Sequence, residues 1–315
     1  MPTALIVDPI SKHHDPGWNH PESPERFDAV FRALQNEGLL DMALPLSPRK
    51  ATEEELAWCH DPDYIAQVRH EIQSGMTQVS TGDTAISFRS YEVAQYAVGA
   101  VFRAVDAVLG GEARNAFCAV RPPGHHATSH RSMGFCIFNN VALGARYAQQ
   151  RHGVKRVLIV DWDVHHGNGT QDIFYEDPSV FYFSTHQAPL YPFTGWAEET
   201  GKGAGKGSTM NVCFPAGAGR AEIMGAFKNS LAPAMESFRP ELVLVSSGFD
   251  SRVDDPLGHF ELTDRDYRDL TAFMMKLAAD HAGNRLISVL EGGYNLHGLA
   301  AAVTAHVREL IFGNR

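Results

Sequence analysis

The sequence has few cysteines and shows no cysteine spacing that would suggest a metal cluster or a disulfide framework. Its 315 residues contain four cysteines, Cys59, Cys118, Cys136 and Cys213, and no two of them form a CxxC pair. Cysteines this sparse are typical of reduced thiols in the interior of a protein. We therefore expect a cytoplasmic protein.

Long hydrophobic runs and basic clusters are also missing. No stretch is apolar for long enough to span a bilayer, and the first residues, MPTALIVDPISKHHD, are charged and interrupted by Pro9, unlike a signal peptide. The net charge is −10, and the lysines and arginines are scattered. This pattern argues against a nucleic-acid partner and against a membrane.

Repeats and phosphate-binding loops are not evident either. The nearest candidate, GKGAGKGS at 201–208, contains glycine and lysine but lacks the Walker spacing. It is better interpreted as a flexible loop.

The composition is that of a globular protein, with 44% hydrophobic and 20% charged residues. Because large α/β sheets grow to this size without dividing, we expect one domain over residues 1–315. Amphipathic stretches at 91–111 and 264–282 predict helices between short β-branched runs. The runs that predict strands lie at 4–7, 116–120, 156–161, 180–185, 209–214, 241–247 and 285–291. Apolar strands that alternate with helices predict a mostly parallel sheet covered on both faces.

Polar clusters follow five of these strands directly. They are RPPGHHATSH, DWDVHHGNG, STHQAPLYPFTG, SSGFDSRVDDPLG and EGGYNL. In an open α/β sheet the ligand crevice lies at the carboxyl ends of the strands. We therefore expect all five clusters to meet at one site.

The segment VLIVDWDVHHGNGTQ predicts a metal site. In an extended segment Asp163 and His165 point to the same side, and Asp250, at another strand end, is the candidate third ligand. Two carboxylates and one imidazole with an open position suit a catalytic zinc ion. Ferrous iron would accept the same ligands.

Two adjacent histidines, His125 and His126, are candidates for proton transfer. Each needs a partner on its far nitrogen, and Asp161 and Asn168 are polar groups beside the metal ligands that fit this need. An aspartate partner raises the basicity of its histidine and a neutral asparagine does not, so the two histidines should titrate differently.

Aromatic residues complete the predicted site. Tyr294, after two glycines, could donate a hydrogen bond to an oxyanion. Gly134, Phe135 and Tyr191 would line a narrow apolar slot.

Taken together, these motifs resemble the zinc-dependent histone deacetylase superfamily, which includes acetylpolyamine amidohydrolases and has an arginase-like α/β fold. The resemblance runs from HPESPERF at 20–27 through PPGHHA, DWDVHHGNGTQ and GFDSRVDDPLG to EGGYNL at 291–296. It implies zinc held by Asp163, His165 and Asp250, and a metal-activated water that removes acyl groups from acyl-lysine.

The resemblance also implies a role for each catalytic side chain. His126 would be the main base and acid, His125 an electrostatic partner and Tyr294 the oxyanion donor. Asp161 would orient His125, and Asn168 would orient His126. Asn168 and Glu291 resemble the class II branch of the family.

Further positions match the binding features of the family. The resemblance implies a structural potassium ion and a substrate tunnel. The potassium ligands would come from Asp161, Asp163, His165, Ser184 and Thr185. The substrate contacts would be Gly134, Phe135, Tyr191, Asp83, Leu257 and Gly292, with Arg26 at the inner end.

Three alternatives stay open. A ureohydrolase of the arginase type would need two manganese ions and further aspartates, whereas Asn168 and the histidine pair stand there instead. A non-catalytic acyl-lysine or partner-binding module should have lost a ligand or the tyrosine. An acetylpolyamine deacetylase usually has a glutamate in the DPLG segment, where this chain has Leu257. The sequence leaves the acyl length, the lysine or polyamine preference and homo-oligomer formation undetermined.

Overall fold

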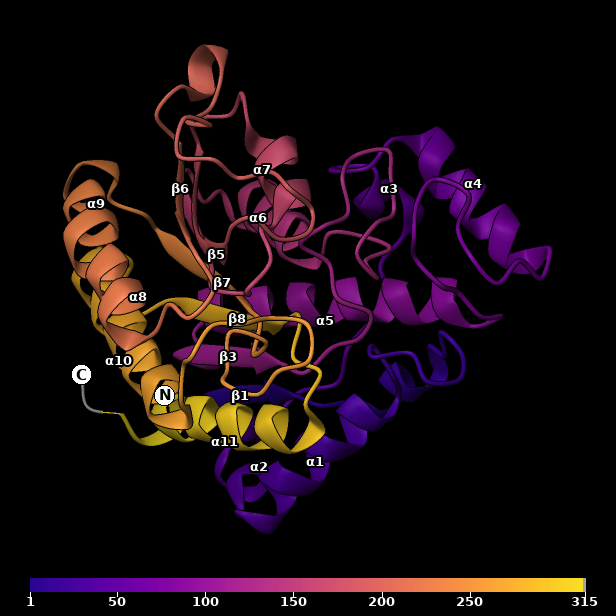
Figure 1. Ribbon diagram of the computed structural model, residues 1–315, viewed down its shortest axis with the longest axis horizontal. Coiled ribbons are helices and arrows are strands. Elements are labelled where there is room, and N and C mark those ends of the chain that lie inside the picture. Colours follow the sequence, from indigo (N-terminus) through magenta and orange to yellow (C-terminus); the bar gives the residue numbers. More distant parts are fainter. Residues whose placement is uncertain (314–315) are drawn as a thin grey trace.

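A single sheet organises the computed structural model, which describes residues 1–313 (Figure 1). Within this range the sheet has eight strands in the order β2-β1-β3-β8-β7-β4-β5-β6, and every neighbouring pair is parallel. The strands are β1 (Thr3–Ile6), β2 (Leu44–Pro45), β3 (Asn115–Cys118), β4 (Val157–Asp161), β5 (Val180–Gln187), β6 (Thr209–Phe214), β7 (Leu242–Ser247) and β8 (Leu286–Leu290). The prediction of a mostly parallel sheet is confirmed, and the sheet is in fact entirely parallel.

The seven predicted strands all form, with ends that differ by a few residues. The eighth, β2, has only two residues and pairs with β1 at the edge of the sheet, where a proline is tolerated. Two residues carry no periodicity that sequence inspection could detect.

Alternation along the strands fills a core on each face of the sheet. In β4, Val157 and Ile159 pack into one core while Leu158 and Val160 pack into the other. The first core is covered by α3 (Glu53–Leu56), α4 (Pro62–Gln73), α5 (Ser90–Leu109), α6 (Asn140–His152) and α7 (Asn168–Phe174).

The second core lies under the helices at the lower and left sides of Figure 1. They are α1 (Glu25–Asn36), α2 (Leu39–Met42), α8 (Arg220–Ala226), the π-helical turn η3 (Phe227–Leu231), α9 (Ala232–Phe238), α10 (Asp264–His281) and α11 (Leu296–Phe312). Two 3₁₀ turns, η1 (Pro9–His13) and η2 (Gly203–Gly205), lie in connecting segments. The turn η2 falls within the predicted glycine-lysine loop.

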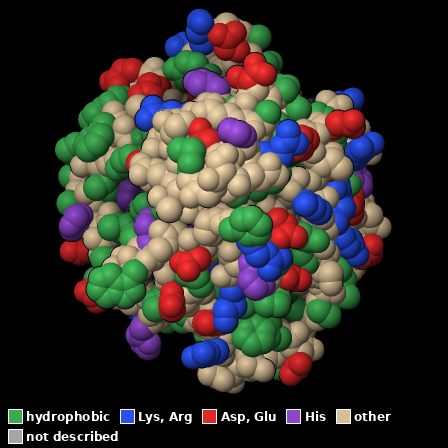
Figure 2. All heavy atoms as spheres, turned by 90° about the vertical axis from the view of Figure 1, so that its right-hand side faces the viewer, with side chains coloured by type: hydrophobic (Ala, Val, Ile, Leu, Met, Phe, Trp, Pro, Cys, Tyr) green, Lys and Arg blue, Asp and Glu red, His purple; other side chains and the backbone are tan. Residues whose placement is uncertain are grey.

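The order of the strands explains why the polar clusters meet. The five strands that precede these clusters, β3, β8, β7, β4 and β5, are consecutive neighbours in the sheet. Because they are parallel, their carboxyl ends share one edge. Figure 2 views the molecule from the right-hand side of Figure 1, where α4 lies, and acidic, basic and apolar side chains are mixed on this face.

Two features outside the site bear on the sequence expectations. The four cysteines are free, and three of them are buried. Among residues 1–313, no helix combines the length and the apolar character that a membrane crossing requires.

Candidate active site

Two buried aspartates and a histidine converge beyond the ends of β4 and β7. Nδ1 of His165 lies 3.0 Å from Oδ1 of Asp163 and 3.2 Å from Oδ2 of Asp250. One ligand atom from each residue lies within 4.8 Å of the others, and both aspartates are fully buried. Two carboxylates held together without access to water repel each other unless a cation lies between them or one of them is protonated. The three residues therefore fit a metal ion.

Glycines and backbone amides fix these aspartates. The N–H of Gly292 donates to Oδ2 of Asp163 at 2.9 Å, and the N–H of Val164 donates to Oδ1 of Asp250 at 2.9 Å. A Cβ at Gly292 would lie 2.0 Å from Oδ2 of Asp250, so only glycine fits there. Gly292, predicted as a substrate contact, thus lies against the two aspartates of the candidate metal site.

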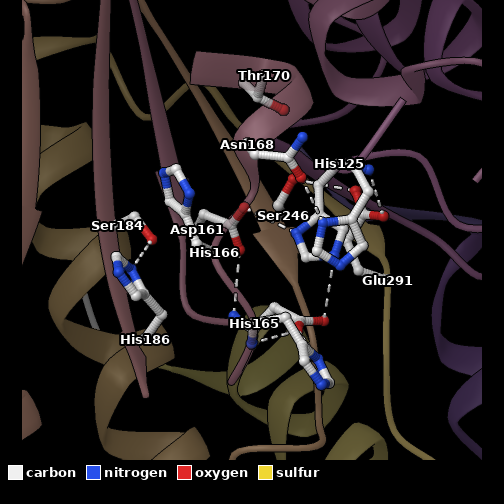
Figure 3. A network of polar contacts seen from close by, with 12 residues as sticks. His125, Asp161, His165, His166, Asn168, Thr170, Ser184, His186, Ser246 and Glu291 are labelled. Carbon is white, nitrogen blue, oxygen red and sulfur yellow. Dashed lines mark hydrogen bonds and ion pairs between the residues drawn. The ribbon is translucent and has the colours of Figure 1, made fainter. Parts of the chain in front are cut away.

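The histidine pair sits between this trio and two orienting side chains. Nδ1 of His125 lies 3.0 Å from Oδ2 of Asp161 (Figure 3). Nδ1 of His126 lies 2.8 Å from Oδ1 of Asn168. The two imidazole rings are 4.0 Å apart. Because each Nδ1–H donates to its partner, Nε2 of His126 is left as the acceptor.

The surroundings drive the two histidine pKa values apart. Burial alone would lower the pKa of His125, but the nearby charges of Asp163 and Asp161 outweigh it and raise that pKa well above its ordinary value. Burial lowers the pKa of His126 well below its ordinary value, and the positive charge of His125 lowers it further. His126 is thus the neutral member of the pair and His125 the cationic one.

A cavity of about 250 Å³ opens above these groups. It is lined by Asp83, His126, Gly134, Phe135, His165, Leu190, Tyr191, Leu257 and Tyr294. Of the predicted substrate contacts, all but Gly292 lie in this lining. Leu190 was not predicted, because nothing in its local sequence distinguishes it from a core leucine.

One wall of the cavity has an unusual backbone. Gly134 and Phe135 both have positive φ, 55° and 69°, and a Cβ at Gly134 would lie 2.2 Å from the ring of His126. The N–H of Gly134 donates to Oδ1 of Asp83 at 2.7 Å, which holds this turn. A left-handed phenylalanine is a costly conformation that tends to occur at functional sites.

Tyr294 reaches the cavity from the loop after β8. Its ring lies 5.9 Å from that of Phe135, and the guanidinium of Arg26 lies 5.1 Å from its ring centroid. Arg26 is buried and donates to the carbonyl oxygens of Glu291 and Gly293, at 2.6 and 2.7 Å. Burial, followed by the charge of Asp250, raises the pKa of Tyr294 well above its ordinary value, so the phenol stays protonated.

The predicted potassium ligands lie together but their role stays a prediction. Ser184 pairs with Asp161 in the register of β5 and β4, and both Ser184 and Thr185 are buried. Oγ of Ser184 lies 2.8 Å from Nδ1 of His186 (Figure 3).

A second buried trio, His125, Cys136 and Glu291, also places its ligand atoms within 4.8 Å of one another. The oxygens of Glu291 already accept hydrogen bonds from the N–H groups of Gly124 and His125 and from the hydroxyl of Ser246. The trio of Asp163, His165 and Asp250 supplies two carboxylates where the second trio supplies one, so it is the better candidate for a metal site.

A sequence comparison decides the family to which these residues belong. The model of the histone deacetylase domain matches residues 20–310. The chain belongs to the histone deacetylase family.

Similar histone deacetylases come from distant organisms. The chain is 42% identical over 309 residues to the human protein named polyamine deacetylase HDAC10, an alignment that covers 93% of this chain and 46% of that protein. It is 40% identical over 278 residues to the histone deacetylase-like amidohydrolase of Pseudomonas aeruginosa, covering 88% and 73% of the two chains. The chain thus spans less than half the length of human HDAC10.

The fold agrees with this assignment. The crystal structure of the HDA15 HD domain superposes with a TM-score of 0.93 at 36% identity, covering 98% of this chain and 88% of that one. Deacetylases of this family generally depend on zinc, and the trio of Asp163, His165 and Asp250 offers a fitting ligand set.

The histone deacetylase motif HPESPERF contributes a buried ion-pair cluster that sequence reasoning did not anticipate. Glu22 lies just before α1 and forms an ion pair at 2.9 Å with Arg26 in the first turn of that helix. The guanidinium of Arg121 also binds the carboxylate of Glu22, at 2.8 Å. All three side chains are buried. Arg121 comes from the distant RPPG segment, so no local signal linked it to the motif.

Proposed function

We propose that this chain is a zinc-dependent amidohydrolase that removes the acetyl group from acetyl-lysine side chains. The single observation that supports this most directly is the shared cavity, in which His126, His165 and Tyr294 all line one space of about 250 Å³. A base, a metal ligand and a protonated phenol around one narrow slot are the groups that amide hydrolysis requires.

Asp163, His165 and Asp250 would hold the zinc ion, which when bound supplies a Lewis acid and lowers the pKa of a water molecule. The remaining chemistry belongs to the side chains. Nε2 of His126 would accept the proton of the attacking water and later return it to the leaving amine. The depressed pKa of His126 keeps it neutral and ready to accept.

Tyr294 and His125 would provide electrostatic support. The protonated phenol of Tyr294 would donate a hydrogen bond to the carbonyl oxygen as negative charge develops there. His125, cationic and bound to Asp161, would add positive charge beside the base. Phe135 and Tyr191 would flank the alkyl part of the substrate and exclude water.

A second candidate substrate is an acetylated polyamine, favoured by the 42% identity to the human polyamine deacetylase. A polyamine would bring a second ammonium to the rim. Leu257 lines the cavity where an acidic side chain would attract that charge. Leu257 therefore favours acyl-lysine, and Asp83 is the acidic side chain of the same cavity that could bind an ammonium instead.

The test is turnover by the zinc-loaded full chain. We expect a higher kcat/KM on an acetyl-lysine peptide than on monoacetylated spermidine, and the loss of both activities in His126→Ala at equal zinc content. A reversed preference would make the polyamine the substrate class. Absence of turnover on both substrates would overturn the proposed hydrolase.

A further inference from the structure

Asp255 joins the tyrosine loop to the loop that follows β7. It is 8% exposed, and its Oδ2 accepts from the N–H groups of Tyr294, at 2.7 Å, and Asn295, at 3.2 Å. Its Oδ1 accepts from the N–H of Leu257 at 3.0 Å. One carboxylate thus binds both the residue that would donate to the oxyanion and the residue at the cavity rim.

Asp163 and Arg26 hold the glycines before Tyr294, through the N–H of Gly292 and the carbonyl oxygen of Gly293, whereas Asp255 binds the N–H of Tyr294 itself. Gly292 and Gly293 precede Tyr294, and Gly293 has φ of 120°, a conformation open to glycine. On the other side, Asn295 begins α11, where its side chain accepts from the N–H of Gly298. Asp255 thus holds the peptide group of Tyr294 between these anchored glycines and the start of α11.

Placing a charged carboxylate at this buried position costs free energy. Burial raises the pKa of Asp255, despite the three N–H donors, and the charge of Asp163 adds to this effect. A neutral side chain would avoid the repulsion from the metal-binding aspartates. The three N–H groups that donate to Asp255 offset this cost, which indicates a role that depends on those hydrogen bonds.

We propose that Asp255 is a positioning residue that places the Tyr294 phenol for the reaction. This inference rests on the proposed hydrolase function. A displaced donor loses much of its stabilisation of the transition state, since catalytic groups act only within about 0.5 Å of the productive geometry. Asp255 acts through Tyr294, and it also fixes Leu257 relative to that tyrosine.

A double-mutant cycle tests the proposal. Asp255→Ala and Asp255→Asn are each made alone and combined with Tyr294→Phe, and kcat and KM are measured on an acetyl-lysine peptide at equal zinc content. We expect Asp255→Ala to lower kcat by about 10-fold or more with little change in KM, on the scale of misplaced catalytic groups. Asp255→Asn should recover part of the loss, because its amide oxygen can still accept from Tyr294 and Asn295.

In the Tyr294→Phe background the same substitutions should lower kcat by less than about 2-fold, since there is no phenol left to place. The carbonyl of trifluoroacetyl-lysine is already activated, so we expect Asp255→Ala to lower kcat on this substrate less than on acetyl-lysine, as we also expect for Tyr294→Phe. The matched control is Asp254→Asn, which removes one charge from the exposed neighbour, where asparagine tolerates the φ of 67°. It should leave kcat unchanged.

Equal fold-losses in the two backgrounds would overturn the positioning role and leave Asp255 as a general structural residue. If Asp255→Ala does not fold, Asp255→Asn completes the cycle, and a loss of kcat in that folded variant that is equal in the two backgrounds would overturn the proposal. The failure of the proposed hydrolase is distinguishable, because then the unmodified chain itself would not hydrolyse acetyl-lysine.

Discussion

Oδ1 of Asn168 lies 2.8 Å from Nδ1 of His126, whereas the neighbouring His125 faces the carboxylate of Asp161 at 3.0 Å. An amide oxygen orients an imidazole without adding a charge, and a carboxylate orients it and stabilises its protonated form. Two adjacent histidines of the same chemistry therefore have different protonation states. In the proposed hydrolase, this difference would separate the base, His126, from its electrostatic partner, His125.

Alanine substitutions of the pair should separate these roles. We expect His126→Ala to lower kcat by about 100-fold or more with zinc retained, the usual scale for the loss of a general base and acid. His125→Ala should lower kcat less, because it removes a nearby charge but leaves the proton acceptor. Kinetics at equal zinc content decide this, and a larger loss in His125→Ala would reverse the two assignments.

Exchanging the neutral partner for a charged one should move the pH profile. The pKa of His126 lies well below its ordinary value, so the acidic limb of kcat/KM should lie below pH 6.5. In Asn168→Asp the new carboxylate would stabilise the imidazolium, raise the pKa of His126 and shift that limb upward by about one pH unit or more. A profile of kcat/KM from pH 5 to 8 measures the shift. An unmoved limb would mean that another group controls it.

The zinc content of the protein should depend on each of the three convergent ligands. Asp163→Ala, His165→Ala and Asp250→Ala each remove one of the ligand atoms that lie within 4.8 Å of one another, so we expect loss of bound zinc together with activity. Elemental analysis of the purified variants gives the zinc-to-protein ratio. Tyr294→Phe, which changes no ligand, is the control. Full zinc occupancy in Asp250→Ala would exclude Asp250 from the metal ligands.

Much of this site could be predicted because the end of a buried strand can be recognised in a sequence, where an apolar run gives way to polar residues. The apolar runs before Asp161 and before SSGFDS indicated buried parallel strands, and the geometry of parallel sheets then brought their polar ends together. The histidine partners followed from the chemical needs of an imidazole. The predicted convergence required only the strand directions and no side-chain packing.

The parts that sequence reasoning missed depend on packing between distant segments. Asp254 and Asp255 are adjacent and chemically identical, yet only the second is buried against the tyrosine loop. Nothing in the local sequence shows which of the two turns inward. The same holds for His60, whose partners Thr128 and Asn139 lie 68 and 79 residues away.

His60 should make folding stability sensitive to acid. Its Nδ1–H donates to the carbonyl of Thr128 at 2.8 Å and its Nε2 accepts from the N–H of Asn139 at 2.9 Å, and burial lowers its pKa to about 4. Above pH 6.5 both the folded and unfolded states hold this histidine neutral. Between pH 6.5 and about 4 the unfolded chain is protonated and the folded one is not, so stability falls by about 1.4 kcal/mol per pH unit.

Urea unfolding at several pH values checks this. We expect His60→Gln, which cannot titrate, to show a shallower fall in the free energy of unfolding over that window, even if it is less stable at pH 7. The exposed His13 provides the control, since His13→Gln should keep the slope of the unmodified chain. An unchanged slope in His60→Gln would contradict the prediction.

Tyr294 decides whether this cavity works as a hydrolase. As water attacks the amide, negative charge builds on the carbonyl oxygen, and a metal ion covers only one side of it. The phenol is a single donor kept protonated by its raised pKa, and the loss of one such donor typically costs about 3–4 kcal/mol of transition-state stabilisation. Tyr294→Phe should therefore lower kcat on acetyl-lysine by about 100- to 1000-fold. KM and zinc content should hardly change, because this hydrogen bond forms mainly in the transition state. On trifluoroacetyl-lysine, kcat should fall less, since the carbonyl of this substrate is already activated. Equal kcat values for the two proteins on acetyl-lysine would show that Tyr294 only packs against Phe135 and Arg26, and the oxyanion would then need another donor.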